Sequence, residues 1–164
     1  IIGGDGPDTP EYQTLRKMAR KLGLQKKVTF VGRIEQKHLP PYYSAADVLV
    51  VPSYYESFGL VGLESLACGT PVVATDVGAM RSILRDGETG KIVTDSNPRP
   101  LAQAIEAFIT GSGAKKLPAD RVRRSVLKFG WSNVAAAIID EYDTLFRQIN
   151  YEASDNASAK VSSL

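Results

Sequence analysis

Residues 48–52, Val-Leu-Val-Val-Pro, and residues 56–64, Glu-Ser-Phe-Gly-Leu-Val-Gly-Leu-Glu, decide the fold of this chain. The first segment is an unbroken apolar run, which is typical of a buried parallel strand. The second begins as a polar loop and is predicted to continue as a helix over 59–68. A strand, a short polar loop and a helix, in that order, is the arrangement with which α/β proteins hold a ligand.

This loop and helix also predict an anion site between two carboxylates. The first N–H groups of the helix, near Gly59 to Gly62, lack intrahelical partners and lie at the positive end of the helix dipole. Such an end binds phosphate, and a glycine lets the phosphate approach the backbone. Glu56 precedes the helix and Glu64 lies inside it, so we expect them on either side of the anion. Carboxylates accept hydrogen bonds from neutral hydroxyls and repel a second anion. The pattern therefore favours a nucleotide sugar.

The spacing of the two glutamates resembles the E-x₇-E motif of retaining glycosyltransferases with the GT-B fold, the group 1 type of glycosyltransferase family 4. Other segments are similar to the donor-binding C-terminal domain of the same enzymes: residues 43–48 (YSAADV), 64–74 (ESLACGTPVVA) and 86–90 (DGETG). The resemblance covers residues 1–147, with the motifs in the same order and at similar intervals. It implies a retaining hexosyltransferase.

The resemblance also implies roles for individual residues. Glu64 would hydrogen-bond the ribose hydroxyls, and Glu56, as the catalytic residue, would hold a hydroxyl of the donor sugar. Arg33 and Ile34 would contact the nucleobase, largely through their backbone. The N–H groups of four consecutive residues would contact the sugar and the diphosphate: Phe58, Gly59, Leu60 and Val61.

The implied reaction moves a hexose from a nucleoside-diphosphate sugar of the UDP, GDP or ADP type to a hydroxyl acceptor. The acceptor would be a sugar, a polyol or a lipid-linked glycan bound by an N-terminal domain that this chain does not match. We expect no cofactor and no metal, because the chain contains no Asp-x-Asp motif. The first β-α unit of the family's donor domain has no counterpart either. We therefore expect the isolated chain to be inactive. We expect the gap between the strands that end near Gly4 and Pro52 to be closed by rearrangement, by a strand of another molecule, or by residues that precede Ile1.

Three other functions are compatible with the sequence. A sugar-nucleotide epimerase shares the two-domain fold, and a non-catalytic module would bind a nucleotide sugar without transferring it. The turn at residues 3–8, Gly-Gly-Asp-Gly-Pro-Asp, raises the third alternative, a nicotinamide site. That fingerprint needs glycine or alanine at position 9, where this chain has Thr9. A nicotinamide enzyme is therefore disfavoured.

Composition sets the class of protein. The 164 residues suit one domain, and a net charge of +2 is too small to indicate nucleic acid binding. The single cysteine, Cys68, excludes an internal disulfide and is typical of a reducing compartment, so we expect the cytoplasm. A basic helix at 9–23 is interpreted as a solvated surface, with peripheral contact to anionic lipid as the alternative.

Alternation of strands and helices predicts an α/β fold, a doubly wound Rossmann-like and mostly parallel sheet. We expect the donor-binding domain to occupy residues 1–149 and residues 150–164 to form a disordered tail. Strands are predicted at 28–31, 48–52, 71–75 and 90–93, and helices at 9–23, 36–45, 59–68, 80–84, 100–109, 122–129 and 134–149.

Overall fold

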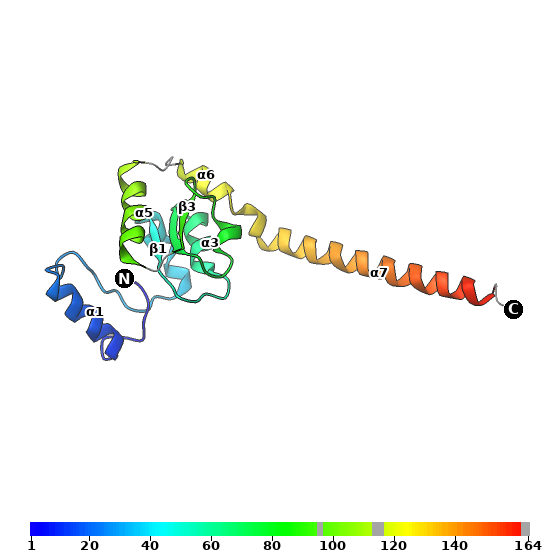
Figure 1. The fold of residues 1–164 in the computed structure, drawn as a ribbon, viewed down its shortest axis with the longest axis horizontal. Helices are drawn as coiled ribbons and strands as arrows, with labels where there is room; N and C mark the ends of the chain where they lie inside the picture. Colours follow the sequence, from blue (N-terminus) through cyan, green and yellow to red (C-terminus); the bar gives the residue numbers. More distant parts are fainter. Residues whose placement is uncertain (95–96, 113–116, 162–164) are drawn as a thin grey trace.

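The computed structural model describes residues 1–94, 97–112 and 117–161 and confirms the predicted α/β architecture (Figure 1). A parallel sheet of order β1-β2-β3 forms its centre. The described elements are α1 (Pro10–Lys21), η1 (Gln36–His38), α2 (Pro40–Ala45), β1 (Leu49–Val51), α3 (Leu60–Ala67), β2 (Val72–Thr75), α4 (Met80–Ile83), β3 (Gly90–Val93), α5 (Pro98–Thr110), α6 (Ala119–Arg124), η2 (Leu127–Phe129) and α7 (Trp131–Val161).

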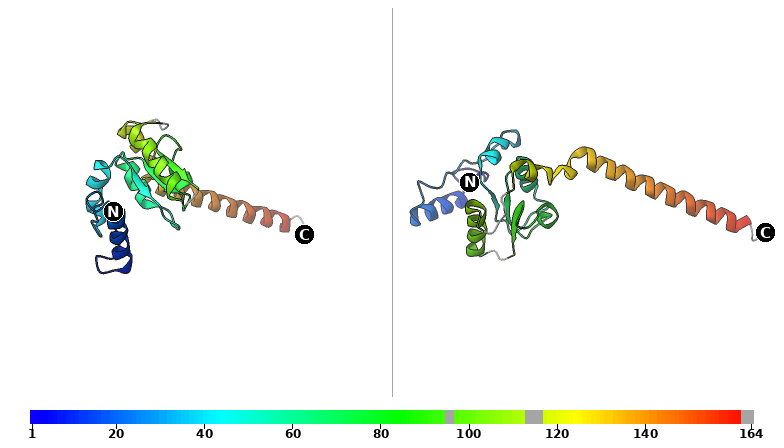
Figure 2. Two further views of the ribbon diagram at one scale, coloured as in Figure 1. Left: turned by 60° about the vertical axis from the view of Figure 1, so that its left-hand side comes forward. Right: turned by 90° about the horizontal axis from the view of Figure 1, so that it is seen from above.

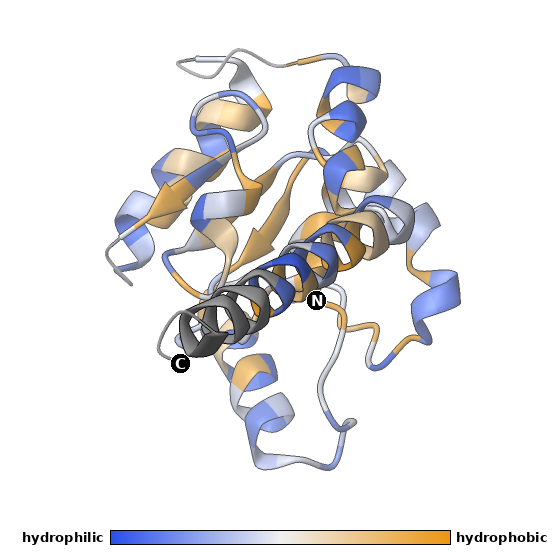
Figure 3. Cartoon of the chain, turned by 90° about the vertical axis from the view of Figure 1, so that its right-hand side faces the viewer, coloured by the Kyte–Doolittle hydropathy of each residue, from blue (hydrophilic) through white to orange (hydrophobic). Residues whose placement is uncertain are grey.

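The central strand β2 explains why helices cover both faces of the sheet. Successive side chains of a strand point to opposite faces. Val72 and Ala74 pack with Leu66 of α3 on one face, and Val73 packs with Phe108 of α5 on the other. All four residues of β2 are buried, and the strands are the most apolar part of the chain (Figure 3). This continuous apolar character is the pattern that a doubly covered parallel strand requires.

The outer edge of β3 is covered by the turn that precedes it. The N–H of Gly87 donates to the carbonyl of Gly90 at 2.9 Å, and the N–H of Ile92 donates to Asp86 Oδ1 at 3.4 Å. Lys91 Nζ lies 2.7 Å from Asp86 Oδ2. Gly90 and Ile92 on this edge therefore already have partners within the chain.

The N-terminal residues form a second, separate parallel pair. The N-terminal amine of Ile1 donates to the carbonyl of Thr29 at 2.7 Å, and the N–H of Val31 donates to the carbonyl of Ile1 at 2.9 Å. A single bridge, Ile2 to Gly32, replaces the regular strand predicted at 28–31. Gly32 has φ +81°, which ends the extended path. Within the described residues, β1 is paired only with β2, so the expected gap beside β1 is not closed by this pair.

The helix α7 differs from the sequence expectation at its C-terminal end. It continues to Val161, so residues 150–161 are helical where the composition indicated a disordered tail, while 162–164 lie outside the described residues. Residues 151–161 contain three alanines and neither glycine nor proline, so nothing local ends the helix. The helix extends away from the α/β body (Figure 2). Trp131 at its start is 88% exposed.

Candidate functional site

The predicted site lies where the chain leaves the carboxyl end of β1 and enters α3. Gly59 is the N-cap of α3, with φ +93°, a left-handed conformation that favours glycine. It is buried, and a Cβ built on it would lie 2.5 Å from the terminal carbon of Met80. A Cβ on Gly62, one turn further, would lie 3.2 Å from the same atom. The two glycines therefore let the fully buried Met80 pack directly beneath the start of the helix.

The end of β2 and the segment that follows it hold this loop in place. The hydroxyl of Thr75 donates to the carbonyl of Ser53 at 2.5 Å, and the N–H of Ala79 donates to the carbonyl of Phe58 at 3.1 Å. A Cβ at Gly78 would lie 3.0 Å from the carbonyl oxygen of Glu56, so only glycine fits there without displacement. Two neighbouring parallel strands thus fix the loop, as the carboxyl edge of such a sheet is expected to do.

The start of α3 presents unpaired N–H groups, as predicted. Among the described residues, no backbone or side-chain acceptor is found for the N–H groups of Phe58, Gly59, Leu60 and Val61. The side chains of Phe58, Leu60 and Val61 are 38%, 60% and 38% exposed. The backbone of this segment is therefore free to bind an anion, with apolar side chains around it.

Glu56, on the loop, is partly buried. Its Oε1 accepts a 3.4 Å hydrogen bond from the hydroxyl of Ser53, three residues earlier. This long bond leaves most of the carboxylate's acceptor capacity unused.

Glu64, one helix turn before the end of α3, is held more tightly. Its Oε2 accepts from the hydroxyl of Tyr43 in α2 at 2.8 Å, and its Oε1 accepts from Nε2 of Gln36 in η1 at 2.5 Å. Burial, followed by the hydrogen bond to Glu64, raises the pKa of Tyr43 well above its ordinary value. Sequence reasoning missed both partners. Both fall within the helix predicted at 36–45, and no spacing in the sequence links positions 36 and 43 to position 64.

Arg33 and Ile34 lie directly before η1, so Gln36 connects their segment to Glu64. Arg33 is exposed and Ile34 is partly buried. The structure thus brings the segment predicted to contact the nucleobase next to the glutamate predicted to bind the ribose. It leaves the base-contacting role itself a prediction.

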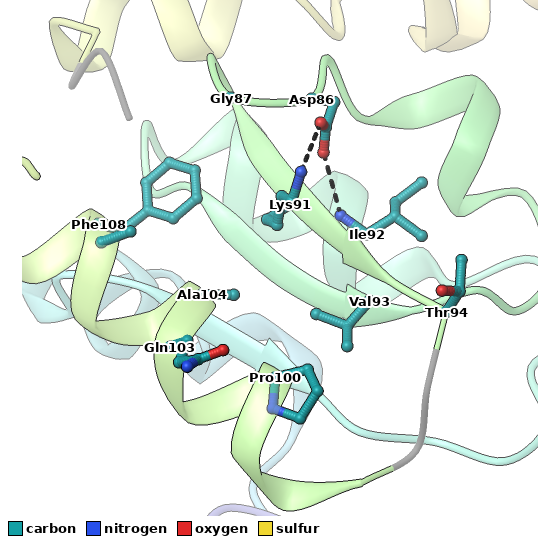
Figure 4. Close-up of a pocket in the computed structure, with 11 residues that line it drawn as sticks. Asp86, Gly87, Lys91, Ile92, Val93, Thr94, Pro100, Gln103, Ala104 and Phe108 are labelled. Carbon is teal, nitrogen blue, oxygen red and sulfur yellow. Dashed lines mark hydrogen bonds and ion pairs between the residues drawn. The ribbon is translucent and has the colours of Figure 1, made fainter. Parts of the chain in front are cut away.

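A separate hollow of about 690 Å³ lies between β3 and α5 (Figure 4). Its walls include Val93, Ala104 and Phe108, and its charged side chains, Asp86 and Lys91, are paired with each other. None of its lining residues belongs to the predicted site. The hollow offers no converging set of unpaired polar groups, so we place the candidate site at the start of α3.

Two further properties concern only the part of the chain that the structure describes. No three His, Cys, Asp or Glu side chains gather there in a way that could hold a metal ion. No helix there is both long and apolar enough to cross a bilayer. The metal-free and cofactor-free site and the cytoplasmic location remain predictions.

Comparison with known proteins identifies the family. The family described as "Glycosyl transferases group 1" matches residues 1–124. D-inositol 3-phosphate glycosyltransferase 2 of Catenulispora acidiphila is 39% identical over 143 residues, which is 87% of this chain and 34% of that protein. A D-inositol 3-phosphate glycosyltransferase of Acidothermus cellulolyticus is 37% identical over 165 residues, covering 98% of this chain and 36% of that protein. The chain therefore spans about a third of the length of these curated relatives.

Solved structures agree with the fold. Sucrose-phosphate synthase from Thermosynechococcus elongatus aligns with a TM-score of 0.75 and 38% identity, over 90% of this chain and 38% of that one. The Anabaena protein HepE in complex with UDP aligns with a TM-score of 0.70 over 87% of this chain and 40% of that one. Its identity is 21%, so this second likeness supports the fold alone. These neighbours have the GT-B fold, as the sequence predicted.

Proposed function

We propose that this chain, which belongs to the group 1 glycosyl transferases, is the donor-binding domain of a retaining glycosyltransferase. The full-length protein would move a hexose from a nucleoside-diphosphate sugar to a hydroxyl acceptor. The chain spans about a third of the length of its curated relatives, so we propose this activity for the full-length protein.

One observation carries the proposal: unpaired N–H groups at the start of α3 lie between two glutamates in the chain. The N–H groups of residues 58–61 suit the diphosphate, because an anion there gains hydrogen bonds and the favourable end of the helix dipole. Glu56 and Glu64 suit hydroxyl groups, since each carboxylate keeps free acceptor positions. We assign Glu64 to the ribose and Glu56 to the donor sugar.

The geometry suits the departure of a diphosphate. As the bond to the sugar breaks, negative charge grows on the leaving group, and donors already in place stabilise that charge without reorganising. Gly59 and Met80 fix the start of the helix, so these donors are held in advance. Glu56 would orient the sugar while the acceptor attacks from the face that the diphosphate leaves.

For the acceptor, we propose a chemical class. The curated relatives are named for D-inositol 3-phosphate, and the solved relative is a sucrose-phosphate synthase. We infer a sugar or polyol acceptor, with a lipid-linked glycan as the other option, bound mainly by a domain outside this chain. The basic residues of α1 would give peripheral contact with anionic lipid only in that last case. The isolated chain is expected to transfer no sugar.

Steady-state kinetics of the full-length protein test the two glutamates. Glu64→Ala should raise KM for the donor, because a charged hydrogen bond of about 1.5–3 kcal/mol is lost, roughly a 10- to 150-fold weakening. Glu56→Ala should lower kcat more than it raises KM. Glu88→Ala is the matched control, an exposed glutamate in the turn before β3. Wild-type kinetics for both site variants would refute the proposed donor site.

A further inference from the structure

The two oxygens of the Glu64 carboxylate have different surroundings. Oε2 accepts from the hydroxyl of Tyr43, a buried residue, at 2.8 Å. Oε1 accepts from the amide of Gln36, an exposed residue, at 2.5 Å. An ionised carboxylate has about four lone-pair positions, so each oxygen can accept one further hydrogen bond. Oε1, whose partner Gln36 is exposed, therefore lies on the more open side of the carboxylate, and Oε2 faces the buried Tyr43.

Tyr43 is fixed from several directions. Its side chain is buried, with the residue 8% exposed. Its backbone carbonyl accepts a 2.6 Å hydrogen bond from the hydroxyl of Thr70, which is 3% exposed and lies just before β2. Burial and the neighbouring Glu64 raise the pKa of Tyr43, so its hydroxyl remains a donor at alkaline as well as neutral pH. A rigid neutral donor of this kind can hold a carboxylate in one orientation.

We propose that Tyr43 is a positioning residue that turns the Glu64 carboxylate so that Oε1 faces the ribose of the donor nucleotide. Gln36 occupies Oε1 from the exposed side and links it to the segment carrying Arg33 and Ile34. The inference rests on the proposed function, because it requires that Glu64 bind ribose. Discrimination between ribose and deoxyribose then depends on the hydroxyl of Tyr43, which touches no substrate.

The consequence of losing this hydroxyl follows from the contacts. In Tyr43→Phe the buried ring is retained and Oε2 loses its only donor among the described residues. The carboxylate then rotates about its terminal bond, because that torsion is soft. Contacts with ribose hydroxyls weaken, whereas the N–H groups that bind the diphosphate are unchanged.

The experiment compares nucleotides that differ by one hydroxyl. Binding to the full-length protein is measured by calorimetry for UDP, GDP and ADP, and the tightest is compared with its 2′-deoxy and 3′-deoxy forms. Variants are Tyr43→Phe, Glu64→Gln and the double variant. Tyr42→Phe is the matched control, since Tyr42 is 44% exposed and no hydrogen bond is found for its hydroxyl in the described residues.

We expect the wild type to prefer a ribonucleotide over at least one deoxy form by about tenfold or more. Tyr43→Phe should lose most of that preference, with affinity for the deoxy form nearly unchanged. Adding Glu64→Gln to Tyr43→Phe should weaken ribonucleotide binding less than Glu64→Gln does alone, because the two residues act as one unit.

The outcomes distinguish failure of the positioning role of Tyr43 from failure of the ribose assignment of Glu64. If Glu64→Gln removes the preference and Tyr43→Phe keeps it, the positioning role is refuted and the proposed donor site stands. If Glu64→Gln leaves ribonucleotide binding unchanged, the ribose assignment fails, and the positioning role fails with it. A Tyr43→Phe variant that unfolds at a lower temperature yet keeps the preference would also refute positioning, because Tyr43 would then act on stability alone.

Discussion

Replacing Gly59 by alanine tests how the start of α3 is built. The residue has φ +93°, and its added Cβ would lie 2.5 Å from the terminal carbon of Met80. The left-handed conformation costs a residue with a Cβ about 1–2 kcal/mol. The clash adds about 1–3 kcal/mol, because Met80 is fully buried and has little room to move. We therefore expect Gly59→Ala to lower the free energy of unfolding by about 2–5 kcal/mol.

Gly87→Ala is the matched control. Gly87 has φ +73°, and nothing lies within 4 Å of a Cβ built there. This control carries the conformational cost without the clash, about 1–2 kcal/mol. The difference between the two variants is therefore the contribution of packing against Met80.

Thermal unfolding, followed by circular dichroism, gives the stability of each variant. We expect the melting temperature of Gly59→Ala to fall by about 5–15 °C and to fall further than that of Gly87→Ala. In a Met80→Ala background the extra cost of Gly59→Ala should shrink toward that of the control. Equal losses for the two glycine variants would refute the account of close packing beneath the helix.

Two other measurements test the burial of Tyr43 and of Leu66. The hydroxyl of Tyr43 has a raised pKa in the folded state, so its contribution to stability is full below the unfolded value of about 10 and is lost as pH rises through the higher folded value. Absorbance at alkaline pH should show one late tyrosine that Tyr43→Phe removes; an unchanged curve would contradict this. Leu66→Ala should cost about 2–5 kcal/mol in urea unfolding, because Leu66 is fully buried between α3 and the sheet. Leu60→Ala, at a position 60% exposed, should change stability by less than about 0.5 kcal/mol, and a comparable loss there would contradict the burial argument.

The elements around the site could be predicted because their signals are local. An apolar run bounded by Pro52 predicted the strand β1 and a glycine predicted the start of α3, within about a residue of the observed bounds. The free N–H groups follow from any such helix start. The fold class followed from the order of these elements.

What the sequence did not predict depends on contacts between distant segments or on the absence of a stop signal. Tyr43 and Gln36 meet Glu64 only because α2, η1 and α3 pack together, across 21 and 28 positions of sequence. The segment at 28–31 has strand-like composition, yet it gains a single bridge because Gly32 ends its extended path. The helix α7 passes residue 149 because no glycine or proline stops it, although the polar composition indicated disorder.

The two edges of the sheet have unequal capacity for growth. On β3, the carbonyl of Gly90 and the N–H of Ile92 are engaged by the preceding turn, while β1 has a strand neighbour on one side only among the described residues. An exposed edge is a template for another strand, and a plugged edge is protected from association. The sheet can therefore add a strand beside β1 and not beside β3. A strand from elsewhere in the protein, or from a second molecule during aggregation, would pair with β1, because the edge of β3 is already hydrogen-bonded.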